Sequence, residues 1–357
     1  MELSELRENI DRIDSQIVSL INERYEYVKG VGEWKTDRSS AIYVPEREKA
    51  LLQKLELLNT EGLLENKTLR AIYREIMSGA LALEHPLKIG YLGPEATFTQ
   101  QAALGKFGRS VNYQPCSNIA EVFTEVEMNR INYGCVPIEN STEGAVNYTL
   151  DRFIDSNVKI CAEINMSIHQ NLLANCKTSE IKRIYSHPQA LGQCRNWLQK
   201  RYPGVDLIEV SSTTKAAKIA SIEDNTAAIA SSLAAETYSL QLLEDNIEDN
   251  CDNTTRFLII GKQEPLPTGD DKTSICFAIT DRTGALYDCL LPFKNSDVTL
   301  TMIESRPSKQ KNWQYCFFVD ILGHQNDEKI TKAIGELEKM CQFVKVLGSY
   351  PRSTAVI

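Results

Sequence analysis

A long amphipathic stripe near the start of the chain limits the folds that this sequence can adopt. Between Ser4 and about Lys35, apolar residues recur at steps of three and four, at Leu6, Ile10, Ile13, Ile17, Leu20, Val28 and Val31. This spacing predicts one helix with a single apolar face. At about 1.5 Å per residue, the helix would be roughly 50 Å long.

Two shorter helices are predicted to follow. Pro45 stands at the tolerated first-turn position of one, and the other runs from about Leu64 to Glu84. Residues 1–85 are therefore expected to be all helical. Two short partners leave much of the long stripe uncovered, so we expect a second copy of the chain to cover it, in a homodimer or a higher homo-oligomer.

Charged side chains fall on the apolar faces of these predicted helices. Arg24 and Lys35 are eleven residues apart, so they lie about 20° from each other around the axis, on the stripe. Arg47 falls on the apolar line of the second helix, and Glu84 on that of the third. One such cation could snorkel to water. Several buried cations and one acid instead indicate an anionic ligand, because uncompensated burial is costly. Arg7 lies about 100° off the stripe, so if it joins the same pocket, it would reach there from a partner subunit.

The segments LRENIDRIDSQIVSLINER, GEWK and PERE resemble the all-helical chorismate mutases over about residues 1–85. The resemblance implies that Arg7 of the other subunit, Arg24 and Arg47 hold the two carboxylates of chorismate. It also implies that Lys35 and Glu84 bind its ether oxygen, and Glu48 its hydroxyl. A Claisen rearrangement needs neither nucleophile nor cofactor, only a compact conformer and stabilisation of the charge that develops as the C–O bond breaks.

Three positions depart from that family's usual pattern. The family often has an aspartate before the proline and a serine four residues ahead of Glu84, where this chain has Val44 and Ala80. Substrate contacts at these two positions are either missing or made by the backbone. Many members have glutamine in place of Glu84. A glutamate there donates to the ether oxygen only when protonated, a form that burial beside Ile76 favours.

After His85-Pro86 the pattern changes to short β-rich runs that alternate with helical stretches. The runs cover residues 88–92, 133–136, 159–168, 181–185, 227–230 and 256–260. This alternation predicts an α/β sheet, in which ligands bind at loops beyond the carboxyl ends of strands. GPEATFT, PIENSTEG and SHPQ each follow a predicted strand, so the three loops could meet at one cleft. Each loop alone is also compatible with ordinary helix capping.

Together, VPIENSTEG, SHPQALGQC, SSTTKAA and NTTRF resemble the prephenate dehydratases from about residue 88 to 261. The resemblance implies a two-subdomain α/β domain of the periplasmic-binding-protein type, with Thr255 at the catalytic position. The implied cleft residues are Glu139, Asn140, Ser141, Ser186, Gln189, Gln193, Thr213 and Arg256. The reaction removes the ring hydroxyl and carbon dioxide together. A threonine hydroxyl could protonate the departing group, while loop N–H groups and Arg256 would hold the carboxylates.

Two residues in these loops leave questions open. His187 could be the acid, but a lone histidine that precedes Pro188 at a strand end is more often a hydrogen-bonding group that shapes the loop. Ala96 stands where the family usually has glycine. If that position requires a positive φ, the first loop must adjust to the alanine side chain.

The last part of the chain follows a proline-, glycine- and acid-rich stretch, QEPLPTGDDK, which reads as a linker. The predicted order after it is strand, helix, strand, strand, helix, strand, the ferredoxin-like plan. Residues 272–357 resemble ACT domains, with GALYDCL and ESRP similar to paired phenylalanine-binding motifs. The implied allosteric residues are Gly284, Ala285, Leu286, Glu304, Ser305, Arg306 and Pro307. Alternatively, Gly284 only starts a helix and Arg306 only closes a strand.

Length and composition agree with three domains, which we place at residues 1–86, 87–262 and 272–357 of the 357. A net charge of −9 argues against a nucleic-acid partner. No apolar run approaches membrane-spanning length, and no signal peptide is evident at the N-terminus. The ten dispersed cysteines and four histidines show no metal-ligand spacing. We expect a cytoplasmic protein without metal or cofactor.

Taken together, the three resemblances imply a bifunctional enzyme of phenylalanine biosynthesis. It would rearrange chorismate to prephenate, dehydrate and decarboxylate prephenate to phenylpyruvate, and be inhibited by phenylalanine. One alternative is an arogenate dehydratase, whose substrate differs by an amino group that the sequence does not visibly select. Another is a catalytically silent amino-acid sensor.

Overall fold

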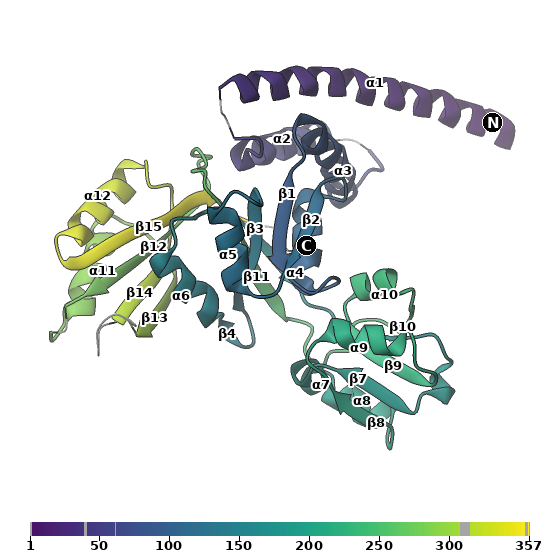
Figure 1. The fold of residues 1–357 in the computed structure, drawn as a ribbon. Helices are drawn as coiled ribbons and strands as arrows, with labels where there is room; N and C mark the ends of the chain where they lie inside the picture. The colour runs from purple at the N-terminus through teal and green to yellow at the C-terminus, as the bar shows by residue number, and fades with distance from the viewer. Residues whose placement is uncertain are drawn as a thin grey trace. The chain divides into compact units, whose positions relative to one another are not determined.

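The computed structural model describes residues 2–38, 41–60, 62–280, 282–307, 315–353 and 356. The chain divides into two compact units, whose elements are labelled in Figure 1. The first unit comprises residues 1–88 and 106–112, and the second comprises residues 89–105 and 113–357. No helix of the described residues is long and apolar enough to cross a membrane.

The first unit contains the three predicted helices: α1 (Leu3–Asp37), α2 (Pro45–Leu58) and α3 (Asn66–Glu84). The expectation of an all-helical N-terminal region is confirmed. The Tyr25 hydroxyl on α1 donates to the Ile76 carbonyl of α3 at 2.9 Å. Gly79 permits this contact, because a Cβ at that position would lie 2.2 Å from the Tyr25 hydroxyl oxygen.

Most of the apolar stripe of α1 has no cover within the chain. Its N-terminal apolar side chains are 41–64% exposed, namely Leu3, Leu6, Ile10, Ile13, Ile17, Val18 and Leu20. A row of large apolar side chains along one helix face is unusual on a monomer, and such a patch commonly marks an interaction surface.

The second unit begins with an α/β lobe built on one mixed sheet. The strands run in the order β2-β1-β3-β11-β5, and β4 pairs with β3. Their bounds are β1 Lys88–Leu92, β2 Asn112–Cys116, β3 Tyr133–Asn140, β4 Gly144–Ala145, β5 Lys159–Ser167 and β11 Thr254–Gly261. The helices of this lobe are α4 (Phe98–Phe107), α5 (Ile119–Glu127) and α6 (Asn147–Asp155).

A second α/β lobe is built on a five-stranded sheet in the order β10-β6-β9-β7-β8. Its strands are β6 Asn171–Ala174, β7 Arg183–Ser186, β8 Asp206–Glu209, β9 Thr226–Ala230 and β10 Gln241–Glu244. Its helices are the short η1 Thr178–Glu180, then α7 Pro188–Gln193, α8 Arg195–Arg201, α9 Thr213–Ala220 and α10 Ser232–Tyr238. Two lobes, each with its own sheet, confirm the predicted α/β dehydratase region with two subdomains.

The chain crosses between the lobes twice, at residues 168–170 and 245–253, and the two crossings are bonded to each other. The Ile168 amide donates to the Asn253 carbonyl at 2.8 Å, and the Ile247 amide donates to the Gln170 carbonyl at 2.8 Å. A Glu248 carboxylate oxygen accepts from the Gln170 amide at 2.8 Å. These bonds join the two crossings into a paired connection between the lobes.

The C-terminal region has the predicted order of strands and helices. Its elements are β12 Asp271–Ile279, α11 Ala285–Asn295, β13 Leu300–Pro307, β14 Tyr315–Leu322, α12 Glu328–Glu338 and β15 Cys341–Pro351. The strands form an antiparallel sheet in the order β13-β14-β12-β15. One face of this sheet shares a hydrophobic core with the first lobe, where Phe318 and Tyr350 pack with Phe123 and Phe153.

Candidate functional sites

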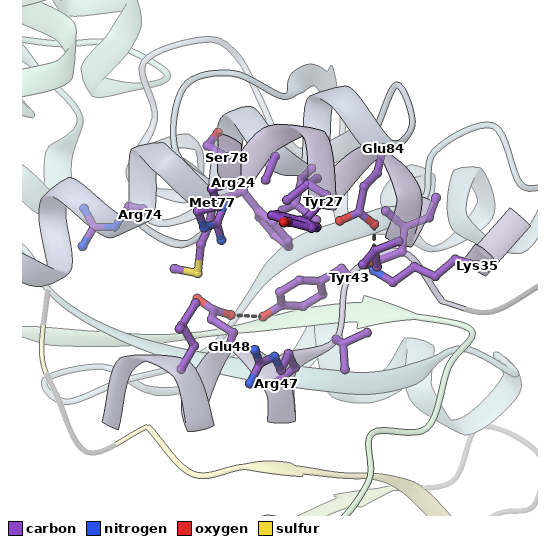
Figure 2. Close-up of a pocket in the computed structure, with 18 of the residues that line it drawn as sticks. Arg24, Tyr27, Lys35, Tyr43, Arg47, Glu48, Arg74, Met77, Ser78 and Glu84 are labelled. Atoms are coloured by element: carbon purple, nitrogen blue, oxygen red, sulfur yellow. Dashed lines mark hydrogen bonds and ion pairs between the residues drawn. The ribbon is translucent and has the colours of Figure 1, made fainter. Parts of the chain in front are cut away.

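A cavity of about 330 Å³ lies inside the first unit (Figure 2). Sequence-predicted residues line it from all three helices and the α1–α2 connection, namely Arg24, Lys35, Val44, Arg47, Glu48, Ala80 and Glu84. The structure therefore brings together every mutase-type position that was predicted within one chain. Val44 is the N-cap of α2 and offers no side-chain cap, as its departure from the family's aspartate implies.

Two ion pairs hold acids inside this cationic cavity. On one side, Lys35 Nζ donates to Glu84 Oε2 at 2.7 Å and to the Ile42 carbonyl at 2.7 Å. On the other, the Tyr43 hydroxyl donates to Glu48 Oε2 at 2.9 Å, and Lys106 Nζ lies 2.9 Å from the same oxygen. Figure 2 shows Lys35 meeting Glu84 and Tyr43 meeting Glu48 on separate sides of the cavity.

Among the described cationic residues of this cavity, Arg24 is the one with a buried nitrogen that lacks a hydrogen-bond partner. Its Nη1 atom is buried and has no hydrogen-bond partner among the described residues. A buried donor without a partner costs free energy, and a guanidinium matches a carboxylate with two parallel hydrogen bonds. The Arg24 side chain is therefore chemically suited to a carboxylate.

Three other cationic side chains of the first unit differ in their relation to the cavity. Arg7 is exposed and lies seventeen residues before Arg24 on α1, about 25 Å along the helix, so it does not line the cavity of its own chain. Arg74 and Lys106 do line the cavity but were not predicted. Helical spacing could have identified Arg74, which precedes Met77, Ser78 and Leu81 by three, four and seven residues on one face.

The second unit contains a cavity of about 290 Å³ lined by residues of both lobes. Five predicted residues line it: Asn140, Gln189, Gln193, Thr213 and Thr255. The loop after β1 and the start of α4 add Thr97, Phe98 and Thr99. The three loops expected to converge, after β1, β3 and β7, thus all contribute to one cavity.

Hydrogen bonds around Asn140 orient the hydroxyl group of Thr255. Asn140 Oδ1 accepts from the Thr142 and Glu143 amides at 3.0 and 3.2 Å. Its Nδ2 must therefore donate, and it lies 2.7 Å from Thr255 Oγ1 and 2.8 Å from Asn253 Oδ1. Thr255 Oγ1 is thus an acceptor toward Asn140, which leaves its proton available to a ligand in the cavity.

Three predicted residues do not line this cavity. Ser186 is fully buried, and its hydroxyl donates to the Ile229 carbonyl at 2.7 Å. Ser141 Oγ accepts from the Thr254 amide at 3.0 Å and donates to the Asp252 carbonyl at 3.1 Å, which fixes the NTTRF segment. The side chain of Glu139 is 42% exposed and is also absent from the lining.

The structure corrects the prediction that Arg256 lies in the substrate cleft. Alternation along β11 places it on the opposite face from Thr255, and it is 9% exposed. Its Nε donates to Glu163 Oε2 at 2.8 Å, its Nη2 donates to the Tyr350 hydroxyl at 2.9 Å, and its Nη1 pairs with Asp320 Oδ2 at 2.6 Å. Burial alone would lower the pKa of Arg256, but Tyr350, Asp320 and Glu163 together raise it well above its usual value. Arg256 therefore bonds the first lobe to the C-terminal sheet rather than a substrate carboxylate.

The structure shows the local surroundings of His187 and Ala96. His187 is the N-cap of α7, and its Nδ1 accepts from the Gln189 amide at 3.4 Å, so it shapes the loop as expected, although it also lines the cavity. Ala96 adopts φ 63°, the left-handed conformation that glycine would adopt without strain. The Ser231 hydroxyl donates to its carbonyl at 3.1 Å.

One further cavity residue, Gln170, lies in the first crossing between the lobes and was not predicted. It is 3% exposed, its Nε2 donates to Gln193 Oε1 at 3.1 Å, and its Oε1 has no partner among the described residues. Nothing in the local sequence pattern singles out this position, because it belongs to a connection rather than to a motif loop.

The predicted effector residues lie at two places in the C-terminal region. Gly284 is the N-cap of α11 with φ 77°, and Ala285 and Leu286 begin that helix. The residues Glu304, Ser305, Arg306 and Pro307 end β13. Arg306 binds Asp151 of α6 through two contacts, Nε to Oδ1 at 3.1 Å and Nη2 to Oδ2 at 3.2 Å. One effector motif is thereby bonded to the first lobe.

Known proteins match this chain along nearly its whole length. A family model described as chorismate mutase type II matches residues 6–85, and one described as prephenate dehydratase matches residues 89–265. The bifunctional chorismate mutase/prephenate dehydratase of Aquifex aeolicus is 51% identical over 356 residues, which is 99% of this chain and 98% of that protein. The protein of the same name from Pseudomonas aeruginosa is 47% identical, with the same coverage of both chains.

A solved structure is similar to about three quarters of this chain. The prephenate dehydratase of Arthrobacter aurescens, in complex with L-Phe, is 34% identical, with a TM-score of 0.69. The match covers 74% of this chain and 90% of that one.

Proposed function

Because this chain belongs to the family of bifunctional chorismate mutase/prephenate dehydratases, we propose that it catalyses two successive reactions. The first unit rearranges chorismate to prephenate, and the second unit converts prephenate to phenylpyruvate, with phenylalanine as inhibitor. The observation that carries the proposal is that residues suited to the two chemistries lie in two separate cavities, one cationic and one lined by amides and hydroxyls. The cytoplasm is the expected location.

In the first cavity, the proposed roles follow from charge and position. Arg24 and Arg47 hold the carboxylates of chorismate, Lys35 and Glu84 bind its ether oxygen, and Glu48 accepts from its hydroxyl. The unpartnered Nη1 of Arg24 supports a carboxylate contact. Catalysis comes from holding the compact conformer and stabilising charge on the ether oxygen as its bond to carbon breaks.

Glu84 is the group proposed to lie beside Lys35 at the ether oxygen, and the two side chains are 2.7 Å apart. Glu84→Gln replaces the carboxylate with an amide, which can donate a hydrogen bond to the ether oxygen. We therefore expect this variant to retain or raise mutase kcat. A large loss of mutase activity with unchanged stability would contradict the proposed contact between this position and the ether oxygen.

In the second cavity, Thr255 is the proposed proton donor to the departing ring hydroxyl. The Asn140 side chain occupies the acceptor side of Thr255 Oγ1 at 2.7 Å, which supports donation toward the ligand. Loop N–H groups and the amides of Gln189 and Gln193 would hold the substrate, since Arg256 is engaged elsewhere. Aromatisation of the ring supplies the driving force for the loss of water and carbon dioxide.

A homodimer completes the first cavity in this proposal. The exposed apolar stripe of α1 would pack against the same stripe of a second chain, since self-complementary faces favour twofold pairing. Arg7 of the partner subunit would then reach this cavity, whereas Arg7 of the same chain lies too far along α1 to line it. Sedimentation measurements should show a dimer or a larger assembly.

The C-terminal region is proposed to be an ACT-type regulatory domain with the ferredoxin-like plan. Phenylalanine would bind at the motifs of residues 284–286 and 304–307 and favour one conformation, since a ligand shifts only equilibria between states that it binds unequally. The Arg306–Asp151 contact supports communication with the dehydratase lobe. Calorimetric titration should detect phenylalanine binding, and its absence would remove the regulatory role.

Incubation of the purified chain with chorismate alone tests the whole proposal. Prephenate should appear first and phenylpyruvate after a lag. A catalytically silent sensor would form neither product. An arogenate dehydratase would accumulate prephenate and form phenylalanine when supplied with arogenate.

A further inference from the structure

Lys106 is an unexpected member of the first cavity. It lies within the segment that matches the prephenate dehydratase family model, residues 89–265. Residues 106–112 nevertheless belong to the first compact unit, and both Lys106 and Phe107 line the cavity formed by α1, α2 and α3. The mutase-type region of residues 6–85 therefore does not supply the whole cavity.

Among the described residues, Lys106 contacts Glu48 and the Tyr43 ring through its ammonium group. Lys106 Nζ lies 2.9 Å from Glu48 Oε2, and the two side chains are 23% and 15% exposed. The same ammonium lies 5.9 Å from the centre of the Tyr43 ring, within the range of a cation–π contact. The adjacent Phe107 packs edge-on against that ring, with centroids 4.9 Å apart.

These contacts fix which oxygen of Glu48 is available to a ligand. Lys106 and the Tyr43 hydroxyl both approach Oε2, and no other described residue donates to the carboxylate. Oε1 is therefore left to accept a hydrogen bond. An ammonium at 2.9 Å also compensates the Glu48 charge, which would otherwise repel the carboxylates of a dianionic substrate in a partly buried site.

We propose that Lys106 is a positioning residue for the mutase reaction, which orients the Glu48 carboxylate so that its second oxygen accepts a hydrogen bond from the chorismate hydroxyl. The dehydratase-type segment thus supplies part of the mutase cavity. This inference rests on the proposed function of Glu48 as the hydroxyl acceptor. Because Glu48 binds the substrate hydroxyl before and during the reaction, loss of Lys106 should raise KM for chorismate more than it lowers kcat.

Steady-state kinetics of full-length variants tests the proposal. Lys106→Met should lower mutase kcat/KM about tenfold, mainly through KM, and leave prephenate turnover within error of the wild type. Lys106→Arg, which keeps the charge, should recover most of the loss. The matched control is Lys54→Met, an exposed lysine on the same helix as Glu48, and it should behave as the wild type does.

A double-mutant cycle separates positioning from a general structural effect. If Lys106 acts through Glu48, adding Lys106→Met to Glu48→Gln should cause no further loss, because contacting residues are non-additive. Additive losses, wild-type kinetics for Lys106→Met, or no recovery with Lys106→Arg would each overturn the proposal. If Glu48→Gln alone retains wild-type mutase kinetics, the proposed role of Glu48 is wrong and the inference fails with it. A wild-type chain without mutase activity would instead refute the proposed function.

Discussion

The two cavities bind isomeric dicarboxylates in the proposed function, yet their linings are very different. The first carries five cationic side chains and two carboxylates, contributed by Arg24, Lys35, Arg47, Arg74, Lys106, Glu48 and Glu84. In the second, His187 is the one titratable side chain among the described lining residues, and hydroxyls, amides and apolar groups make up the rest. A dianion can therefore be held by opposite charges in one site and by oriented neutral dipoles in another.

The difference follows from the chemistry that each site performs. The mutase must stabilise charge that develops on an ether oxygen without donating a full proton, so fixed cations are useful. The dehydratase must deliver a proton to a departing hydroxyl, so an oriented hydroxyl donor is the essential group. The following predictions test this contrast, from the largest expected effect to the smallest.

Thr255→Ala should abolish most dehydration while sparing the mutase. We expect prephenate kcat to fall about a thousandfold, because a positioned proton donor contributes at this scale, with chorismate turnover unchanged. Thr255→Ser keeps the hydroxyl and is the matched control. Substantial phenylpyruvate formation by the alanine variant would remove Thr255 from its role.

Arg24→Met should have the opposite selectivity. Mutase kcat/KM should fall a few hundredfold, in the range seen when one charge-stabilising donor is removed, and prephenate turnover should remain. The reason is that Nη1 of Arg24 is buried and has no hydrogen-bond partner among the described residues, so a bound carboxylate would be its partner. A loss of both activities would mean that Arg24 serves stability instead.

Arg256→Met should act on stability and not on substrate binding. It leaves Glu163 and Asp320 buried with fewer partners, which should cost about 3 kcal/mol of unfolding free energy, measured by denaturant titration. At 25 °C the KM for prephenate should change less than about threefold. A large rise in KM with unchanged stability would restore Arg256 to the substrate site.

A change in ionic strength should give the smallest difference between the two sites. Raising NaCl from about 50 to 500 mM shortens the screening length severalfold, so KM for chorismate should rise several-fold in the cationic cavity. KM for prephenate should change much less, because neutral hydroxyl and amide groups of the protein, and not charged side chains, bind it. Equal salt dependence of both constants would contradict the contrast.

Much of this organisation could be predicted from the sequence because its signals are local. The helix periodicity of residues 4–35 predicted α1, and polar motifs after strands predicted the loops that line the second cavity. Charges on an apolar helix face identified Arg24, Lys35 and Glu84 as candidates for binding an anionic ligand. The family's usual glycine at position 96 indicated a positive φ there, and Ala96 does adopt a positive φ.

What the sequence missed depends on contacts between distant segments. Lys106 reaches Glu48 across 58 positions of the chain, and no local pattern connects them. Short strands with few apolar residues, such as β8 and β10, also escaped prediction because tertiary pairing stabilises them. Arg256 was different, since simple strand alternation places neighbours on opposite faces and could have excluded it from the side of Thr255.

The central claim is that the chain has two independent sites and that prephenate passes from the first to the second. The most direct test is to mix two variants, each inactivated at one site. Arg24→Met and Thr255→Ala would each be supplied with chorismate at neutral pH, separately and together, and phenylpyruvate would be followed over time. Neither variant alone should form it at an appreciable rate, whereas the mixture should form it after a lag during which prephenate accumulates in solution. Phenylpyruvate formation by either variant alone at the wild-type rate, or an inactive mixture in which prephenate still accumulates, would contradict the separation of the two sites.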